Sequence, residues 1–219
     1  MDSLESQEKY CSHCGSKIPA DAKYCPRCGS SQESLLQPAQ EKNLRGYAAK
    51  NSFRIHIILT VASMAVFLIG LLIGSLTSLS HSDAESIINE FLQNIGPTPT
   101  TLQIALNNIT LCMIFLIPAF GTLFMAIVSY NTGIVLSAAA LISPSATQAE
   151  LYLTTLTFPW TWLELLAYSL ASAQGISLLI GALTGRFRQE AKQTLKTAAI
   201  CILLLLIGAV IEANALKSI

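Results

Sequence analysis

The chain contains the segment Tyr10-Cys11-Ser12-His13-Cys14-Gly15 and, shortly after it, a segment of the same form, Tyr24-Cys25-Pro26-Arg27-Cys28-Gly29. Each has two cysteines three positions apart, followed by glycine. This spacing lets the backbone turn tightly with its amides towards the sulfurs, and two such turns facing each other offer four thiolates in the tetrahedral shell that zinc favours. The pattern predicts one structural Zn²⁺, bound by Cys11, Cys14, Cys25 and Cys28.

The cysteine pattern has other interpretations. A pair of disulfides requires an oxidising compartment, and a redox-active CxxC usually begins a helix in a βαβ unit, which this sequence does not suggest. Iron in a shell of four thiolates is a further alternative, and His13 could replace Cys14 as a ligand, although the duplicated pattern argues against this. About thirty residues cannot bury enough apolar surface to fold alone, so we expect the metal to supply the folding energy.

The rest of the chain is strongly apolar. Of the 219 residues, 52% are hydrophobic and only 12% are charged, far from the composition of a soluble domain. No Lys or Arg occurs from Ile55 to Gly185. Basic residues gather on either side of this region, at Lys42, Lys50, Arg54, Arg186, Lys192 and Lys196 among others. The net charge of zero gives no electrostatic argument for nucleic-acid binding, so the expected partner is the lipid bilayer.

The apolar segments predict about five transmembrane helices, since about 20 apolar residues span the hydrocarbon core. The first, Ile55–Leu76, lies too far along the chain to be a cleaved signal peptide. The region Leu102–Ile142 holds two crossings, and its dividing turn lies either at Pro118–Gly121 or at Tyr130–Gly133. The last two segments are Trp162–Gly185 and Leu195–Ala215.

The expected fold is an all-α polytopic membrane bundle with a small N-terminal zinc ribbon. We divide the chain into a zinc ribbon (1–30), a flexible linker with a juxtamembrane basic segment (31–52) and a transmembrane domain (53–219). Basic residues favour the cytoplasmic side of a membrane, and five crossings place both basic clusters there. The protein is then integral to the cell membrane and multi-pass, with a cytoplasmic N-terminus and an external C-terminus.

One outer loop predicts a helix of its own. Ser82-Asp83-Ala84-Glu85 has the pattern of a capping box, which marks a helix start. Apolar residues then follow at helical spacing from Ile87 to Ile95, which predicts a short amphipathic helix. The segment Ser143–Pro159 is polar and mixed in character and is expected to be a loop.

Polar residues inside the apolar segments are few: Asn107, Asn108, Asn131, Glu164, Gln174 and Glu212. Glu164 is the most informative of these, because a carboxylate in a membrane segment is costly and suggests a role. We expect Glu164 to form a polar cluster with the asparagines at 107, 108 and 131, within hydrogen-bond reach of one of them. The alternative is that Glu164 has no specific role and that its carboxylate lies among the lipid headgroups. No catalytic motif accompanies these residues, so we do not expect an enzyme.

The membrane part resembles the stage II sporulation protein M family. The resemblance covers roughly residues 53–215 and is carried by the paired asparagines, the bend Pro118-Ala119-Phe120-Gly121-Thr122, the segment Tyr130-Asn131-Thr132-Gly133, and Phe158-Pro159-Trp160-Thr161-Trp162-Leu163-Glu164-Leu165 followed by Gln174-Gly175. The chain departs from the family at Trp160 and Thr161, where the family has His-Gly. The N-terminal part separately resembles the zinc-ribbon family.

The resemblance implies a role in scaffolding, because the family is associated with membrane complexes that remodel the cell wall in spore-forming bacteria. We therefore expect an integral membrane scaffold or assembly protein with a cytoplasmic zinc-ribbon interaction module. Its partners would be other proteins or a second copy of itself, and no small-molecule substrate is indicated. A small-solute transporter or channel subunit is the alternative, although such a pathway needs several polar groups converging near the bilayer midplane.

Overall fold

The structure is a computed structural model that describes residues 8–20, 22–32, 38–96, 99–143 and 146–217. The chain divides into two compact units, Met1–Ser52 and Phe53–Ile219. Its elements are β1 (Glu8–Tyr10), β2 (Lys17–Pro19), α1 (Pro38–Ser75), α2 (His81–Ile95), α3 (Thr101–Phe115), α4 (Gly121–Ile142), α5 (Gln148–Thr155), α6 (Pro159–Leu183) and α7 (Phe187–Leu216).

The small unit contains a two-stranded antiparallel sheet whose strands flank the first cysteine turn. Strand β1 pairs with β2 in the register Lys9 opposite Ile18, and an isolated bridge joins Tyr24 to Ser31. Ile18 is buried between Cys11 and Cys25. This core is very small, as expected for a domain that a metal ion holds together.

Helix α1 begins at Pro38, earlier than the sequence analysis predicted. Residues 31–52 were expected to form a flexible linker and a basic segment, but the backbone is helical from Pro38 onward, whereas residues 33–37 lie outside the described part. The reason is local composition: Ala, Glu, Lys, Leu and Arg, all good helix formers, dominate this stretch. Helix propensity therefore outweighs the low hydrophobicity from which a linker was predicted.

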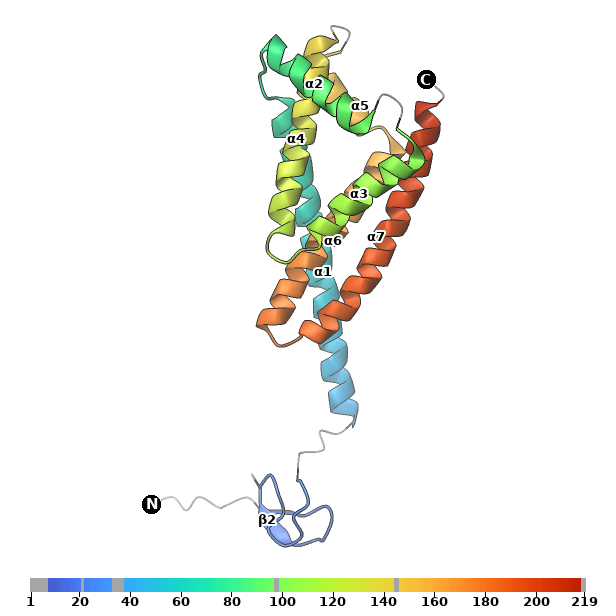
Figure 1. The fold of residues 1–219 in the computed structure, drawn as a ribbon. Coiled ribbons are helices and arrows are strands. Elements are labelled where there is room, and N and C mark those ends of the chain that lie inside the picture. Colours follow the sequence, from blue (N-terminus) through green and yellow to red (C-terminus); the bar gives the residue numbers. More distant parts are fainter. Residues whose placement is uncertain (1–7, 21, 33–37, 97–98, 144–145, 218–219) are drawn as a thin grey trace, which may run out of the picture. The chain divides into compact units, whose positions relative to one another are not determined.

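The large unit is a helical bundle (Figure 1). Four helical segments in the described residues are long and apolar enough to cross a membrane: Phe53–Ser75, Gly121–Ile142, Pro159–Leu183 and Phe187–Leu216. The remaining apolar helix, α3, has 15 residues, a length of about 22 Å at 1.5 Å per residue. The prediction of about five transmembrane helices is thus confirmed in outline, with α3 shorter than the others.

The turn in the middle region lies at the first of the two predicted positions. Residues 116–120 connect α3 to α4, whereas Tyr130–Gly133 lies inside α4. Ala119 has a φ of 67°, which is a left-handed backbone conformation that residues other than glycine rarely adopt. Gly121 packs so closely on the backbone of Phe115 that a Cβ atom would overlap it. α3 ends and the chain reverses direction at Pro118, at Ala119 with its strained backbone, and at Gly121, which packs against the backbone of Phe115.

Helices α1 and α4 cross in backbone contact. A Cβ added to Gly74 would overlap the carbonyl oxygen of Tyr130 and lie 2.9 Å from the Cα of Gly133. Gly70, one turn earlier on α1, is equally close to Ser129. Small residues four positions apart let membrane helices approach in this way. The sequence Gly70-Leu71-Leu72-Ile73-Gly74 carries that signal, which the sequence analysis missed.

Two short helices lie outside the long spans. The amphipathic helix was predicted correctly as α2, but its capping residue was wrong: Ser80, not Ser82, accepts a hydrogen bond from the amide of Asp83. The segment Ser143–Pro159 contains α5, where a loop was expected. Thr147 and Glu150 form a capping box at its start, and the hydrogen bond from the Thr147 amide lowers the pKa of Glu150.

Candidate metal centre and polar clusters

The four predicted cysteines converge in the small unit. Their Sγ atoms all lie within 4.8 Å of one another, and the pairs Cys11–Cys28 and Cys14–Cys25 are each 3.7 Å apart. Zinc–sulfur bonds of about 2.3 Å in a tetrahedron place neighbouring sulfurs about 3.8 Å apart. The sulfur shell therefore fits one structural zinc ion.

Each cysteine pair forms a tight turn that aims backbone amides at a sulfur. The amides of His13 and Cys14 donate to Cys11 Sγ at 3.4 and 3.5 Å. Gly15 and Gly29 follow the second cysteines with φ values of 70° and 69°, which glycine adopts at little cost. The His13 alternative receives no support, because the ligand group found in the described residues contains the four cysteines and not His13.

Two serines complete the duplicated pattern. Ser16 Oγ lies 2.9 Å from Cys14 Sγ and 3.4 Å from Cys25 Sγ. Ser30 Oγ lies 3.1 Å from Cys28 Sγ and 3.4 Å from Cys11 Sγ. Each hydroxyl thus bridges the two halves of the site. Sequence reasoning missed both serines, although each follows its CxxCG at the same offset.

The hydroxyls favour the thiolate form that binds metal. The hydrogen bond from Ser30 is the main cause that lowers the pKa of Cys11 to about 5, and the amides of Cys14 and His13 add to it. Ser16 likewise lowers the pKa of Cys25. Cysteine must lose its proton to bind zinc, so the two serines prepare the two buried cysteines for coordination.

Gln32 breaks the symmetry of the site. Its Nε2 donates to Cys11 Sγ at 3.2 Å, and its Oε1 accepts from the amide of Ser12 at 3.2 Å. The side chain thereby shields one side of the sulfur shell. Cys11 and Cys25 are buried, whereas Cys14 and Cys28 are exposed, so one face of the metal centre stays open to contact.

The second candidate site is the polar cluster around Glu164 in the large unit. Asn108 donates from Nδ2 to Glu164 Oε1 at 2.6 Å, and Asn107 donates to Asn108 Oδ1 at 3.2 Å. The structure thus joins three of the four predicted residues. Asn131 lies on α4 and is exposed there; none of the contacts described for this cluster involves it.

Helix α7 covers the Glu164 cluster. Gly208 of α7 lies against this part of α6, since an added Cβ would be in ordinary contact with Glu164 Cγ at 3.9 Å. Glu212 lies one turn further along α7. The carboxylate of Glu164 on α6 and the amides of Asn107 and Asn108 on α3 therefore meet near the end of the bundle where α6 begins.

A third polar cluster lies at the opposite end of α6 and was not predicted. Gln174 is fully buried. Its Oε1 accepts from His56 Nε2 at 2.8 Å, and its Nε2 donates to Thr194 Oγ1 at 3.2 Å and to the carbonyl of Glu190 at 3.3 Å. This one side chain ties α6 to both α1 and α7. Only the folded arrangement brings these residues together, so the sequence offered little signal.

Smaller polar contacts connect the helices between these clusters. Ser172 on α6 receives a hydrogen bond from Ser63 on α1 at 3.2 Å and lies 2.8 Å from the hydroxyl of Thr122 on α4. The thiols of Cys112 and Cys201 both donate to the carbonyl of Ala167. Polar pairing therefore recurs on α6 between Glu164 and Gln174.

The comparisons with known proteins agree with both resemblances. The family model of stage II sporulation protein M matches residues 63–215, and a zinc-ribbon domain matches residues 10–32. Neither the comparison with curated proteins nor the one with solved structures gave a match. Together with the four long apolar helices, the matches point to a multi-pass membrane protein with a zinc ribbon.

Proposed function

We propose, from the premise that the chain belongs to the stage II sporulation protein M family, that it is a scaffold or assembly protein of the cell membrane. The helical bundle anchors it, and the zinc ribbon binds partner proteins. Arg54, Arg186 and the basic residues in the first turns of α7 support a cytoplasmic ribbon and an external C-terminus, because basic residues prefer the cytoplasmic side. We assign the protein no catalytic activity.

The observation that carries this proposal is the pairing of buried polar side chains along α6. Gln174, Ser172 and Glu164 each form hydrogen bonds with side chains of neighbouring helices. A group whose hydrogen bonds are already made inside the bundle cannot bind a passing solute without breaking them. Pairing of this kind is what a rigid anchor needs, and it favours a scaffold over a conducting pathway.

The ribbon offers a surface suited to protein contact. Tyr10 and Tyr24 precede the first cysteine of each turn, and each is 67% exposed. Tyrosine is enriched in protein interfaces, because it combines apolar area with a polar hydroxyl. Since the interior of the ribbon is occupied by the metal site and Ile18, these two rings are its main apolar groups available to a partner.

A small-solute transporter is the second candidate, and one observation favours it. The hydroxyl of Ser169, on α6 between the Gln174 and Glu164 clusters, is buried and has no hydrogen-bond partner in the described part of the chain. An unpaired buried hydroxyl costs free energy, and a polar solute would satisfy it. Solute uptake into proteoliposomes that Ser169→Ala abolishes would favour the transporter over the scaffold.

Affinity purification of the full-length protein from native membranes tests the scaffold proposal. We expect partner proteins to co-purify with the wild type and to be lost with Tyr10→Ala/Tyr24→Ala, while bound zinc stays at one per chain. His13→Ala is the matched control, because His13 is also exposed on the ribbon but is not one of the four ligands. Identical co-purifying proteins for both variants would contradict the assignment of the binding surface.

A further inference from the structure

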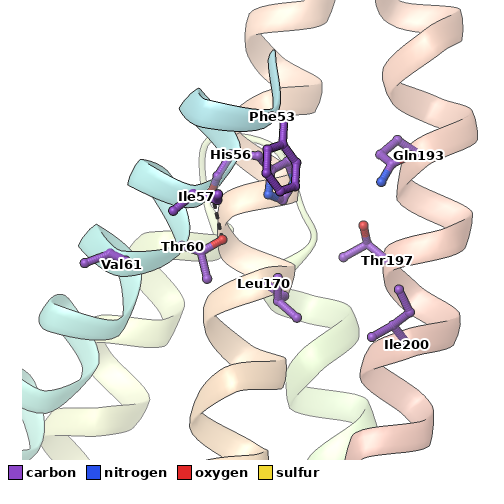
Figure 2. Close-up of a pocket in the computed structure, with 9 residues that line it drawn as sticks. All are labelled: Phe53, His56, Ile57, Thr60, Val61, Leu170, Gln193, Thr197 and Ile200. Atoms are coloured by element: carbon purple, nitrogen blue, oxygen red, sulfur yellow. Dashed lines mark hydrogen bonds between the residues drawn. The ribbon is translucent and has the colours of Figure 1, made fainter. Parts of the chain in front are cut away.

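Figure 2 shows a groove between α1 and α7. It lies towards the end of the bundle that carries Arg54, Lys192 and Lys196, which we call the basic end. Its volume is about 290 Å³. The wall on α1 is formed by Phe53, His56, Ile57, Thr60 and Val61, the wall on α7 by Gln193, Thr197 and Ile200, and the floor by Leu170 of α6. We propose that this groove binds one acyl chain of an anionic phospholipid whose headgroup lies at the basic end.

The groove opens sideways into the membrane. Val61, which lines it, is 62% exposed, and Ile200 on the opposite wall is 52% exposed. Both residues belong to helical segments long and apolar enough to cross a membrane. Lipid tails, rather than water, are therefore the molecules that meet this opening.

The groove has polar residues at one end and apolar residues at the other, as a lipid has a polar headgroup and an apolar chain. On α7 the lining runs from the amide of Gln193 through Thr197 to Ile200, whereas on α1 the ring of Phe53 comes first and is followed by His56, Thr60 and Val61. The hydroxyl of Thr197 and the ring of His56 are already bound to Gln174, which fixes the polar end of the walls. The deeper end, around Leu170, is apolar.

Arg54 stands at the polar end, and Lys196 lies beside the α7 wall about one turn further in. Lys196 shares the stripe of α7 that bears Gln193 and Ile200, since residues three and four positions apart lie on one helix face. Arg54 shares a stripe of α1 with Ile57 and Val61 by the same spacing. Both are exposed. Basic residues beside a pocket between transmembrane helices attract anionic lipid headgroups, so a negatively charged phosphate diester fits this end.

The size of the groove selects a lipid chain over a protein helix. From Gln193 to Ile200 the wall is about 10 Å long at 1.5 Å per residue, and a helix of 10 Å diameter over that length would need about 800 Å³. The groove holds about 290 Å³. At about 30 Å³ per small group, the volume of a water molecule in the liquid, that is room for about ten methylene groups.

Native mass spectrometry of the full-length protein tests this proposal. The protein is incubated with phosphatidylglycerol or phosphatidylcholine of equal chain length and then stripped with excess detergent. We expect the wild type to retain one phosphatidylglycerol. Val61→Phe fills the groove and should lower retention about tenfold, equivalent to about 1.4 kcal/mol. Val210→Phe is the matched control, because Val210 is also exposed, at 49%, on α7 but does not line the groove.

A second pair of variants tests the headgroup. Lys196→Gln should lower the preference for phosphatidylglycerol over phosphatidylcholine about fivefold, the effect of one basic residue at a membrane surface. Lys217→Gln, at the far end of α7, should leave the preference unchanged. If Val61→Phe does not fold, the comparison of Lys196→Gln with Lys217→Gln still tests whether an anionic lipid binds at this end. Equal retention by Val61→Phe and Val210→Phe, no retained lipid in the wild type, or a protein dimer that Val61→Phe disrupts would each overturn the proposal.

Discussion

The contact between α1 and α4 predicts that Gly133→Ala destabilises the bundle. The added Cβ would overlap the carbonyl oxygen of Leu71, and it would lie 2.6 Å from the amide nitrogen of Ser75 and 2.8 Å from the Cα of Gly74. Carbon atoms in contact are about 3.5 Å apart, so the helices must separate by about 0.7 Å. Because the obstacle is backbone and not a flexible side chain, overpacking should cost about 1–3 kcal/mol.

Part of that cost is offset by helix propensity. Alanine is more favourable than glycine inside a helix by about 0.5–1 kcal/mol, which leaves a net destabilisation of about 1 kcal/mol and at most about 2.5 kcal/mol. At about 2–4 °C per kcal/mol for a chain of this size, the melting temperature should fall by several degrees. Circular dichroism at 222 nm on the protein in mild detergent measures this shift.

Gly208→Ala is the control for the same assay. Its added Cβ would meet the nearest atoms at 3.8 Å, which is ordinary contact, so only the gain in helix propensity remains. We expect an unchanged or slightly raised melting temperature. If Gly133→Ala were as stable as Gly208→Ala, backbone contact between α1 and α4 would not be the feature that holds these helices together.

Three further predictions concern the sites. Cys25→Ser should reduce bound zinc from one per chain to none by elemental analysis while the far-ultraviolet spectrum of the membrane helices persists; unchanged zinc would contradict the assignment of the ligands. Glu164→Leu leaves the buried amide of Asn108 without its acceptor and should cost about 1–3 kcal/mol, whereas Glu164→Gln keeps an acceptor and should cost less; equal thermal stability of the two would argue against the hydrogen bond. A topology reporter fused at residue 1 or within 186–196 should be cytoplasmic and one after Ile219 external, and both termini on one side would mean that α3 or another helix does not cross.

The metal centre could be predicted in nearly all its parts, because the CxxCG spacing is itself the geometry of the turn. What was missed there, Ser16 and Ser30, was visible as a repeated serine after each glycine. Gln32 could not be predicted, since it stands outside the repeat and reaches Cys11 only through the fold. The spacing of residues along the chain is thus sufficient to predict the metal ligands, but it does not predict a neighbouring group such as Gln32.

The membrane part was predictable in its segments and less so in its contacts. Apolar length identified the long helices, but the turn at 116–120 required the strained Ala119 and the close packing of Gly121, which only the structure shows. The pairing of His56 with Gln174 joins residues 118 positions apart. Such contacts depend on how the helices are arranged, which apolar periodicity does not encode.

The shortness of α3 has a consequence for the surrounding bilayer. The long segment of α1 has 23 residues, an apolar height of about 34 Å, whereas the 15 residues of α3 reach about 22 Å. The hydrocarbon core of a bilayer is about 30 Å thick, which is close to the length of the α1 segment and greater than the length of α3. Each ångström of mismatch costs a fraction of a kcal/mol. Tilting would only shorten the projection of α3 further, so the lipids beside it must thin locally, and the protein is suited to thinner or deformed regions of membrane.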